Sequence, residues 1–126
     1  MRNDTLLHRQ INPSWIQEGR VTSQAFKPTP KDGKQLSVYD GDQISAENAW
    51  QHYTADLGFP SAGVLAVAVA ECLELGLRAM PKPDPFPEHA IIDFSEYPNA
   101  QIEKTAKKLK ACAQARGYLY PTEAIT

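Results

Sequence analysis

Three short segments in the first third of the chain have the sequence pattern of β-strands. Residues 5–11, TLLHRQI, carry side chains that suit a strand and end at a turn signal, NPS. Residues 20–26, RVTSQAF, alternate with a period of two. Residues 35–40, QLSVYD, repeat this pattern after the loop 27–34, in which two prolines remove amide donors. We therefore predict three strands here.

The most hydrophobic stretch of the chain is AGVLAVAVAEC, at residues 62–72. Bulky residues alternate with alanines over Val64–Ala70, which predicts a central strand with helices packed close on its alanine side. A buried helix is the alternative, because alanine and leucine also favour helices. Residues 89–94, HAIIDF, predict a second central strand. The preceding stretch LRAMPKPDPFPEHA, at residues 77–90, contains four prolines from Pro81 to Pro87 and predicts an extended connector with little regular structure.

Two segments have the spacing of amphipathic helices. The first begins after Ser45, a good N-cap, and ends at Gly58. The second covers residues 99–116 and ends at Gly117. Its predicted buried stripe consists of Ile102, Ala106, Leu109 and Ala113. Residues 118–120 are predicted to add a last short strand.

These elements together predict an α+β fold. We expect a single domain over residues 1–126, with an ordered core at 5–120, frayed termini and a mostly antiparallel sheet of four to five strands on which two helices pack. The composition, 42% hydrophobic and 22% charged residues, is that of an ordinary globular domain.

Charge and hydropathy restrict the function. A formal net charge of −2 argues against a protein that coats nucleic acid. The run Val64–Ala70 is too short for a membrane span, and the N-terminal residues lack the apolar core of a signal peptide. Without an export signal, Cys72 and Cys112 are expected to be buried free thiols in a cytoplasmic protein with no membrane association.

No metal or cofactor motif stands out in the sequence. Cysteine and histidine spacings typical of zinc sites are missing, so we predict no metal and no cofactor. Asp40 and Asp42 would point to the same side of an extended backbone and could hold a hard metal ion. A turn-forming Asp-Gly followed by a solvated aspartate is the favoured interpretation.

Histidines are the next candidates for chemistry. His8 and Arg9 are adjacent, so in a strand they point to opposite faces and cannot both meet one ligand without a bend. His52 lies outside the apolar stripe of the first helix, which predicts a surface histidine. His89 and Asp93 lie about 13 Å apart along an extended strand, too far for a direct pair.

Glu71 and the basic face of the helix 99–116 are two further charged features of the sequence. Glu71, at the end of the hydrophobic run, would need a cation if buried, and Arg9 or Arg20 could supply it. The helix 99–116 has a basic face that could follow phosphates, although a solvated face is the favoured interpretation. Its lysines are Lys104, Lys107, Lys108 and Lys110.

The segments 20–26 and 35–40 carry the most site-like pattern. We predict that they are neighbouring antiparallel strands whose donors and aromatic ring form a recognition surface, with a half-exposed edge hairpin as the alternative. The candidate binding residues from both strands and from the first segment are His8, Arg9, Arg20, Ser23, Gln24, Tyr39 and Asp40.

Four stretches resemble a family of short bacterial proteins without an assigned activity. They are LLHRQINPSWIQEGRVTSQAF, LSVYDGDQISAENAWQHYT, AVAVAEC and EHAIIDF, and the resemblance spans residues 6–120. It implies a stand-alone bacterial domain and assigns no catalytic residue.

Three functions are compatible with these features. The first is a small binding or regulatory module that acts through a protein partner or by self-association, and it ranks first because each catalytic constellation is incomplete. The second is an enzyme on a nucleotide or other phosphorylated substrate, in one version with an ADP-ribosyl transferase-like site. The third is a weak nucleic-acid binder that uses the last helix. Whether the protein is an enzyme stays open at this point.

Overall fold

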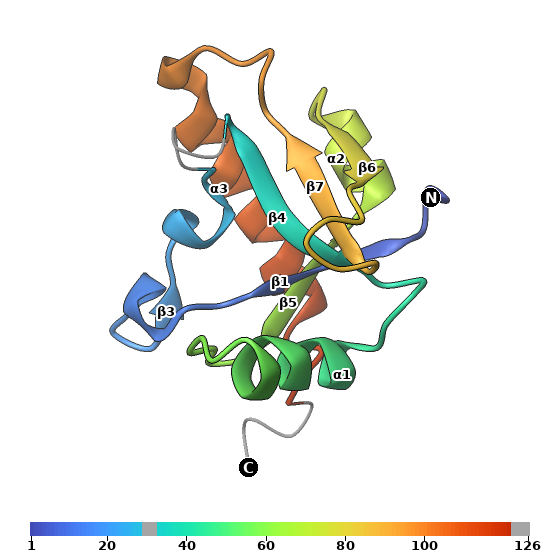
Figure 1. Cartoon of the computed structure of the whole chain (residues 1–126). Coiled ribbons are helices and arrows are strands. Elements are labelled where there is room, and N and C mark those ends of the chain that lie inside the picture. The colour runs from blue at the N-terminus through green and yellow to red at the C-terminus, as the bar shows by residue number, and fades with distance from the viewer. Residues whose placement is uncertain (29–32, 122–126) are drawn as a thin grey trace.

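A five-stranded antiparallel sheet forms the centre of the protein. The computed structural model describes residues 1–28 and 33–121 (Figure 1). The strands follow the order β5-β1-β4-β7-β6 across the sheet. Their bounds are β1 Leu6–Gln10, β4 Gln35–Asp40, β5 Val64–Ala68, β6 Arg78–Pro81 and β7 His89–Asp93. The predicted α+β class with a mostly antiparallel sheet is confirmed.

One face of the sheet forms the hydrophobic core. Leu7 lies opposite Val67, and Leu36 lies opposite Ile92, so these side chains share one face. All four belong to the core cluster, together with buried residues of the helix α3 (Asn99–Arg116). In Figure 1, α3 lies behind the sheet, where it covers this face. The side chains that alternate with these residues point to the other face.

Helix α3 has the predicted bounds and the predicted buried stripe. Gly117 ends the helix with a φ of 85°, a conformation that glycine adopts without strain. Pro98 occupies the N-cap position, and the helix begins at Asn99. The stripe and the added Thr105 are buried; these residues are Ile102, Thr105, Ala106, Leu109 and Ala113.

The hydrophobic run 62–72 contains both a strand and a helix. Strand β5 ends at Ala68, and helix α2 (Val69–Glu74) follows at once. The prediction of a central strand is wrong, because β5 lies at the edge of the sheet and pairs only with β1 among the five strands. Helix α3 does not pack on the alanine side as predicted, since Leu65 and Val67 of β5 join the core beneath this helix.

The segment 20–26 is not a strand beside β4. Strand β3 (Arg20–Val21) pairs with β2 (Ile16–Gln17) in a separate two-stranded sheet, and η2 (Ser23–Phe26) is a 3₁₀-helix. A two-residue turn joins β2 to β3, and its residues Glu18 and Gly19 have φ values of 53° and 77°. Positive φ values at both turn residues are typical of tight hairpins. The turn therefore pairs β3 with β2, and the segment does not join the main sheet.

Two further elements frame the face opposite the core. Helix α1 (Ala46–Gln51) begins after Ser45, whose side chain accepts a hydrogen bond from the Asn48 amide, as predicted. It continues as the π-helix η4 (His52–Asp56). The predicted connector is partly wrong, because its beginning forms strand β6, which pairs with β7.

The C-terminal segment adds one bridge to the edge of the sheet. Residues 118–120 contribute an isolated bridge between Tyr120 and Val64 in place of a full strand. The predicted fraying at residues 122–126 and the loop residues 29–32 lie outside the described residues.

Both cysteines are free; Cys72 is buried and Cys112 is half-buried. Within the described ranges, no helix has the length and hydrophobicity to cross a membrane.

Candidate functional site

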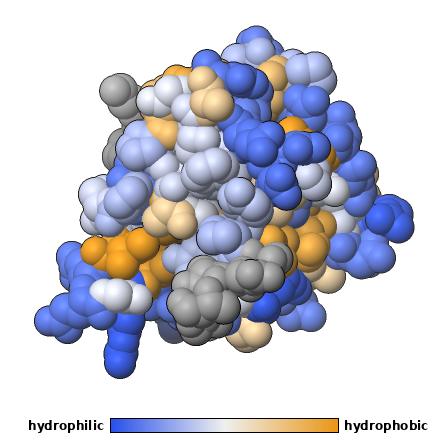
Figure 2. All heavy atoms as spheres, turned by 90° about the horizontal axis from the view of Figure 1, so that it is seen from below, coloured by the Kyte–Doolittle hydropathy of each residue, from blue (hydrophilic) through white to orange (hydrophobic). Residues whose placement is uncertain are grey.

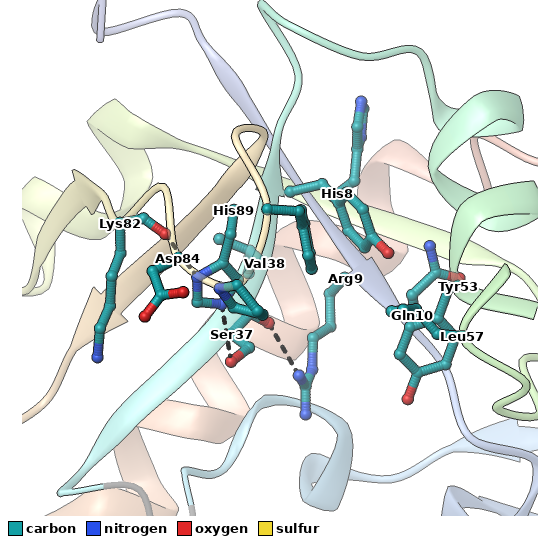
Figure 3. Close-up of a pocket in the computed structure, with 13 residues that line it drawn as sticks. His8, Arg9, Gln10, Ser37, Val38, Tyr53, Leu57, Lys82, Asp84 and His89 are labelled. Atoms are coloured by element: carbon teal, nitrogen blue, oxygen red, sulfur yellow. Dashed lines mark hydrogen bonds between the residues drawn. The ribbon is translucent and has the colours of Figure 1, made fainter.

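A cleft with a volume of about 370 Å³ opens on the sheet face opposite the core. Strands β1, β4 and β7 form its floor, η4 forms one wall, and the loop 82–88 forms another (Figure 3). The residues that line it include His8, Arg9, Gln10, Ser37, Tyr39, Tyr53, Lys82, Asp84, Phe86 and His89.

Strand register places three of these side chains in one row. His8 lies opposite Tyr39 on β1 and β4, and Tyr39 lies opposite His89 on β4 and β7. Directly paired residues in an antiparallel sheet project to the same face. Ser37, two residues before Tyr39 on β4, therefore shares this face and lies diagonal to His89. The alternation that buries the core on one side thus creates a polar floor on the other.

Ser37 and His89 are in hydrogen-bond contact at this floor. The Ser37 Oγ atom lies 3.1 Å from Nε2 of His89. The Nδ1 atom of the same ring lies 2.9 Å from the backbone oxygen of Lys82. Figure 3 shows both contacts as dashed lines on either side of the imidazole. His89 is 8% exposed, whereas the Ser37 side chain is exposed to the cleft.

An aromatic cluster covers one end of the floor. The ring of Phe86 stacks on Tyr39 with 5.0 Å between centroids, and it meets His52 edge-on at 4.6 Å. The Tyr39 hydroxyl lies 2.8 Å from Nδ1 of His52. Burial raises the pKa of this hydroxyl above its ordinary value. The prediction that His52 is a surface histidine is therefore corrected, since it is half-buried and packs against Phe86 of the cleft wall.

Arg9 is held beside Ser37 by backbone contacts. Its Nε donates to the Ala25 carbonyl at 2.7 Å, and its Nη1 donates to the Ser37 carbonyl at 2.9 Å. The guanidinium also lies 4.9 Å from the ring centre of Trp15. These contacts fix a positive charge at the cleft.

The adjacent residues His8 and Arg9 both line the cleft, although they alternate along β1. Strand alternation predicted that the two could not both meet one ligand without a bend, yet both side chains border the same cleft. Arg9 reaches round to the Ser37 carbonyl, because its long side chain is not restricted to the side on which its Cβ starts.

Two buried polar side chains lie deeper in the floor. His8 is 4% exposed and Gln10 is 5% exposed. Among the described residues, neither Nδ1 of His8 nor Nε2 of Gln10 has a hydrogen-bond partner. Burial lowers the pKa of His8, so its imidazole favours the neutral form. Buried polar atoms are normally paired, so each unpaired one needs a physical explanation, such as a bound water or a role in binding.

The structure brings together three of the seven candidate binding residues. His8, Arg9 and Tyr39 line the cleft. Asp40 projects to the opposite sheet face, where it accepts hydrogen bonds from the amide of Asp42 and the side chain of Gln43. The favoured turn interpretation of this Asp-Gly-Asp stretch is consistent with these local bonds.

The other three candidates lie outside the cleft. Arg20 and Gln24 are exposed on β3 and η2, and Ser23 donates a hydrogen bond to the carboxylate of Glu103 on α3. The predicted pairing of segments 20–26 and 35–40 is therefore wrong, and the two segments do not form one shared strand surface.

Sequence reasoning missed most of the site. Ser37, His89, Lys82 and Phe86 were not among the candidates, although the two-residue alternation in QLSVYD already placed Ser37 and Tyr39 on one face. The missing information was the strand partner: β7, not residues 20–26, lies beside β4. His89 was compared only with Asp93 on its own strand, while its partner lies on the neighbouring one.

Glu71 has a partner other than the two arginines considered from sequence. Its carboxylate pairs with Arg116 at 3.0 Å and accepts the backbone N–H of Ala68 at 2.7 Å. This pair joins α2 to the end of α3 and lies outside the cleft. In the described part of the chain, no group of three or more His, Cys, Asp or Glu side chains is arranged to hold a metal ion.

Comparisons of the chain with protein-family models, curated proteins and solved structures give no match. The resemblance to a family of short bacterial proteins stays a prediction.

Proposed function

We propose that the protein binds a small, flat organic anion in the cleft between β4, β7 and the loop 82–88. The observation that carries this proposal is the convergence of an aromatic wall and several polar side chains on one concave site. Small-molecule sites combine these features: apolar surface supplies area, and a few placed polar groups fix orientation.

The size and the wall of the cleft support a small ligand. A volume of about 370 Å³ lies in the range of small-molecule sites. Phe86 is half-buried and already stacks on Tyr39, so it is held in place and can present surface to a planar group. Little side-chain freedom would then be lost on binding.

The charges at the cleft favour an anion. Arg9 and Lys82 carry positive charges, and Asp84 carries a negative one, which leaves a formal charge of +1 among the lining residues with histidines neutral. The whole chain has a net charge of −2, so the cleft differs in sign from the rest of the molecule. The positive charge of the cleft would attract a carboxylate or phosphate group.

Binding can be mapped by NMR with matched pairs of aromatic carboxylates and their neutral amides. We expect the carboxylates to shift the amide resonances of Ser37, Phe86 and His89. Lys82→Met should weaken carboxylate binding by up to about 5-fold and leave amide binding unchanged, since an exposed charge contributes up to about 1 kcal/mol. Phe86→Ala should weaken both ligand types.

Lys107→Met provides the matched control, because Lys107 is exposed on α3, which covers the opposite face of the sheet. It should leave both affinities unchanged. Shifts that map to residues outside the cleft, or equal effects of Lys82→Met and Lys107→Met, would contradict the proposal.

The exposed hydrophobic residues of the described chain do not specifically favour a protein-docking surface. The exposed large hydrophobic residues of the described chain are Met1, Leu57, Phe59 and Leu73. Figure 2 shows separate hydrophobic patches among hydrophilic residues on the visible part of the face beneath α1. Action through a protein partner or by self-association, and a bacterial cytoplasmic location, therefore stay predictions.

A further inference from the structure

We propose that Ser37 is a nucleophile, that His89 is its general base, and that the pair transfers acyl groups from small esters to water. The inference rests on the proposed function, because it requires that the cleft admit a small molecule. It goes further by assigning a reaction to two side chains at the cleft floor.

The contacts of His89 fix which nitrogen carries the proton. The Lys82 backbone carbonyl can only accept a hydrogen bond, so Nδ1 of the neutral imidazole, 2.9 Å away, must be its donor. Nε2 then carries the lone pair and faces the Ser37 hydroxyl at 3.1 Å. The hydroxyl therefore donates to the ring, which is the direction of proton transfer that a serine nucleophile needs.

The two residues differ in exposure in the way that this role requires. His89 is 8% exposed and is held by two hydrogen bonds and by the edge of Phe86, with 5.3 Å between the ring centres. Ser37 is exposed and lines the cleft, so its oxygen is open to a substrate. Because His89 is held in place next to the accessible Ser37 hydroxyl, little conformational entropy is lost when the two reach the reactive geometry.

Two positively charged side chains line the same cleft as the Ser37 hydroxyl. The Arg9 guanidinium is anchored on the Ser37 carbonyl, and Lys82 lines the same cleft. An ester carbonyl attacked by Ser37 develops negative charge on its oxygen, and nearby cations stabilise that charge. The same field that favours an anionic ligand would therefore also favour the tetrahedral intermediate.

The reaction balances with water as the second substrate. Ser37 Oγ attacks the ester carbonyl carbon while its proton moves to His89 Nε2. The tetrahedral intermediate expels the alcohol oxygen, which takes that proton, and leaves an acyl group on Ser37. Water then attacks the acyl carbon and gives a proton to His89, which returns it to Ser37 Oγ as the carboxylic acid leaves.

The substrate class follows from the cleft. A small ester with a flat apolar group would place that group against Phe86 and its carbonyl above Ser37. Aryl acetates have this form and are suitable probes. A fluorophosphonate reacts with activated serine hydroxyls and reports the nucleophile independently of the ester chosen.

The test combines fluorophosphonate labelling, with peptide mass spectrometry, and p-nitrophenyl acetate hydrolysis. We expect one adduct, on Ser37, and an ester hydrolysis rate above that of buffer. Ser37→Ala should abolish both, and His89→Gln should lower the labelling rate at least about 100-fold, the usual contribution of a general base. Ser95→Ala, at another exposed serine, should change neither.

Several outcomes would overturn this inference. One is the absence of Ser37 labelling in folded protein, and another is labelling that His89→Gln leaves unchanged. His89 is buried in an inner strand, so His89→Gln could fail to fold. In that case Ser37→Ala and the position of the adduct still test the inference. Ligand shifts at the cleft without labelling would refute the reaction and retain the binding proposal, whereas no shifts and no labelling would refute both.

Discussion

The Tyr39 hydroxyl and the Nδ1 atom of His52 lie 2.8 Å apart and connect the sheet to the helical wall of the cleft. Burial raises the pKa of Tyr39 above its ordinary value of 10.0, so at neutral pH the hydroxyl keeps its proton. This bond joins β4 to η4, two elements separated by a turn and α1.

Tyr39→Phe removes this bond while it keeps the aromatic stack on Phe86. We expect the variant to lose about 1 kcal/mol of unfolding free energy in urea titrations, because the half-buried His52 nitrogen loses its partner. Tyr53→Phe, at a half-exposed position, is the control and should lose less. Equal losses of unfolding free energy in the two variants would show that the bond between Tyr39 and His52 makes no particular contribution to stability.

Leu109 and Lys107 test the orientation of α3. Leu109 is fully buried and Lys107 is exposed. Leu109→Ala should lower the unfolding free energy by about 2–4 kcal/mol, and Lys107→Ala should change it by less than about 0.5 kcal/mol. Equal changes in urea melts would contradict the placement of this helix on the core.

Glu71 makes stability depend on acid pH. Burial alone would raise the pKa of its carboxyl group, but the bonds from Arg116 and from the Ala68 amide hold it below its ordinary value of 4.5. A carboxylate whose pKa is lower in the folded state stabilises the fold above the unfolded-state pKa. That contribution disappears as the pH falls through the folded-state pKa.

Glu71→Gln should therefore unfold more easily than the native chain at pH 7, and the difference should narrow as the pH falls from about 5 to about 3. Chemical melts across this range measure it. Glu74→Gln, at an exposed position of the same helix, should follow the native curve. A constant difference between native protein and Glu71→Gln at every pH would show that the ionised carboxylate is not responsible.

Nucleic-acid binding should be weak or absent, because the chain is acidic overall and α3 presents its lysines to solvent without interleaved aromatic rings. Gel shifts with single-stranded and duplex DNA and RNA at about 150 mM salt would detect phosphate-driven complexes that survive screening. A sub-micromolar complex that disappears when Lys104, Lys107 and Lys108 are replaced would overturn this expectation.

The elements that depend on local pattern were predicted well. The stripe of α3 repeats with helical spacing, and Ser45 carries the side chain that an N-cap needs, so both could be read before the fold was known. The sequence also showed that Ser37 and Tyr39 share one side of their strand, because side chains alternate with a fixed period.

The sequence by itself thus determined the α+β class, the buried face of α3 and the alternation within each strand. Only the tertiary structure decided that β7 lies beside β4, that β5 is an edge strand, and that Ser37 meets His89. The reason is physical: periodicity is set by neighbouring backbone geometry, whereas any strand can hydrogen-bond to many others. Long-range packing selects the partner, and the cleft exists only where the selected partners meet.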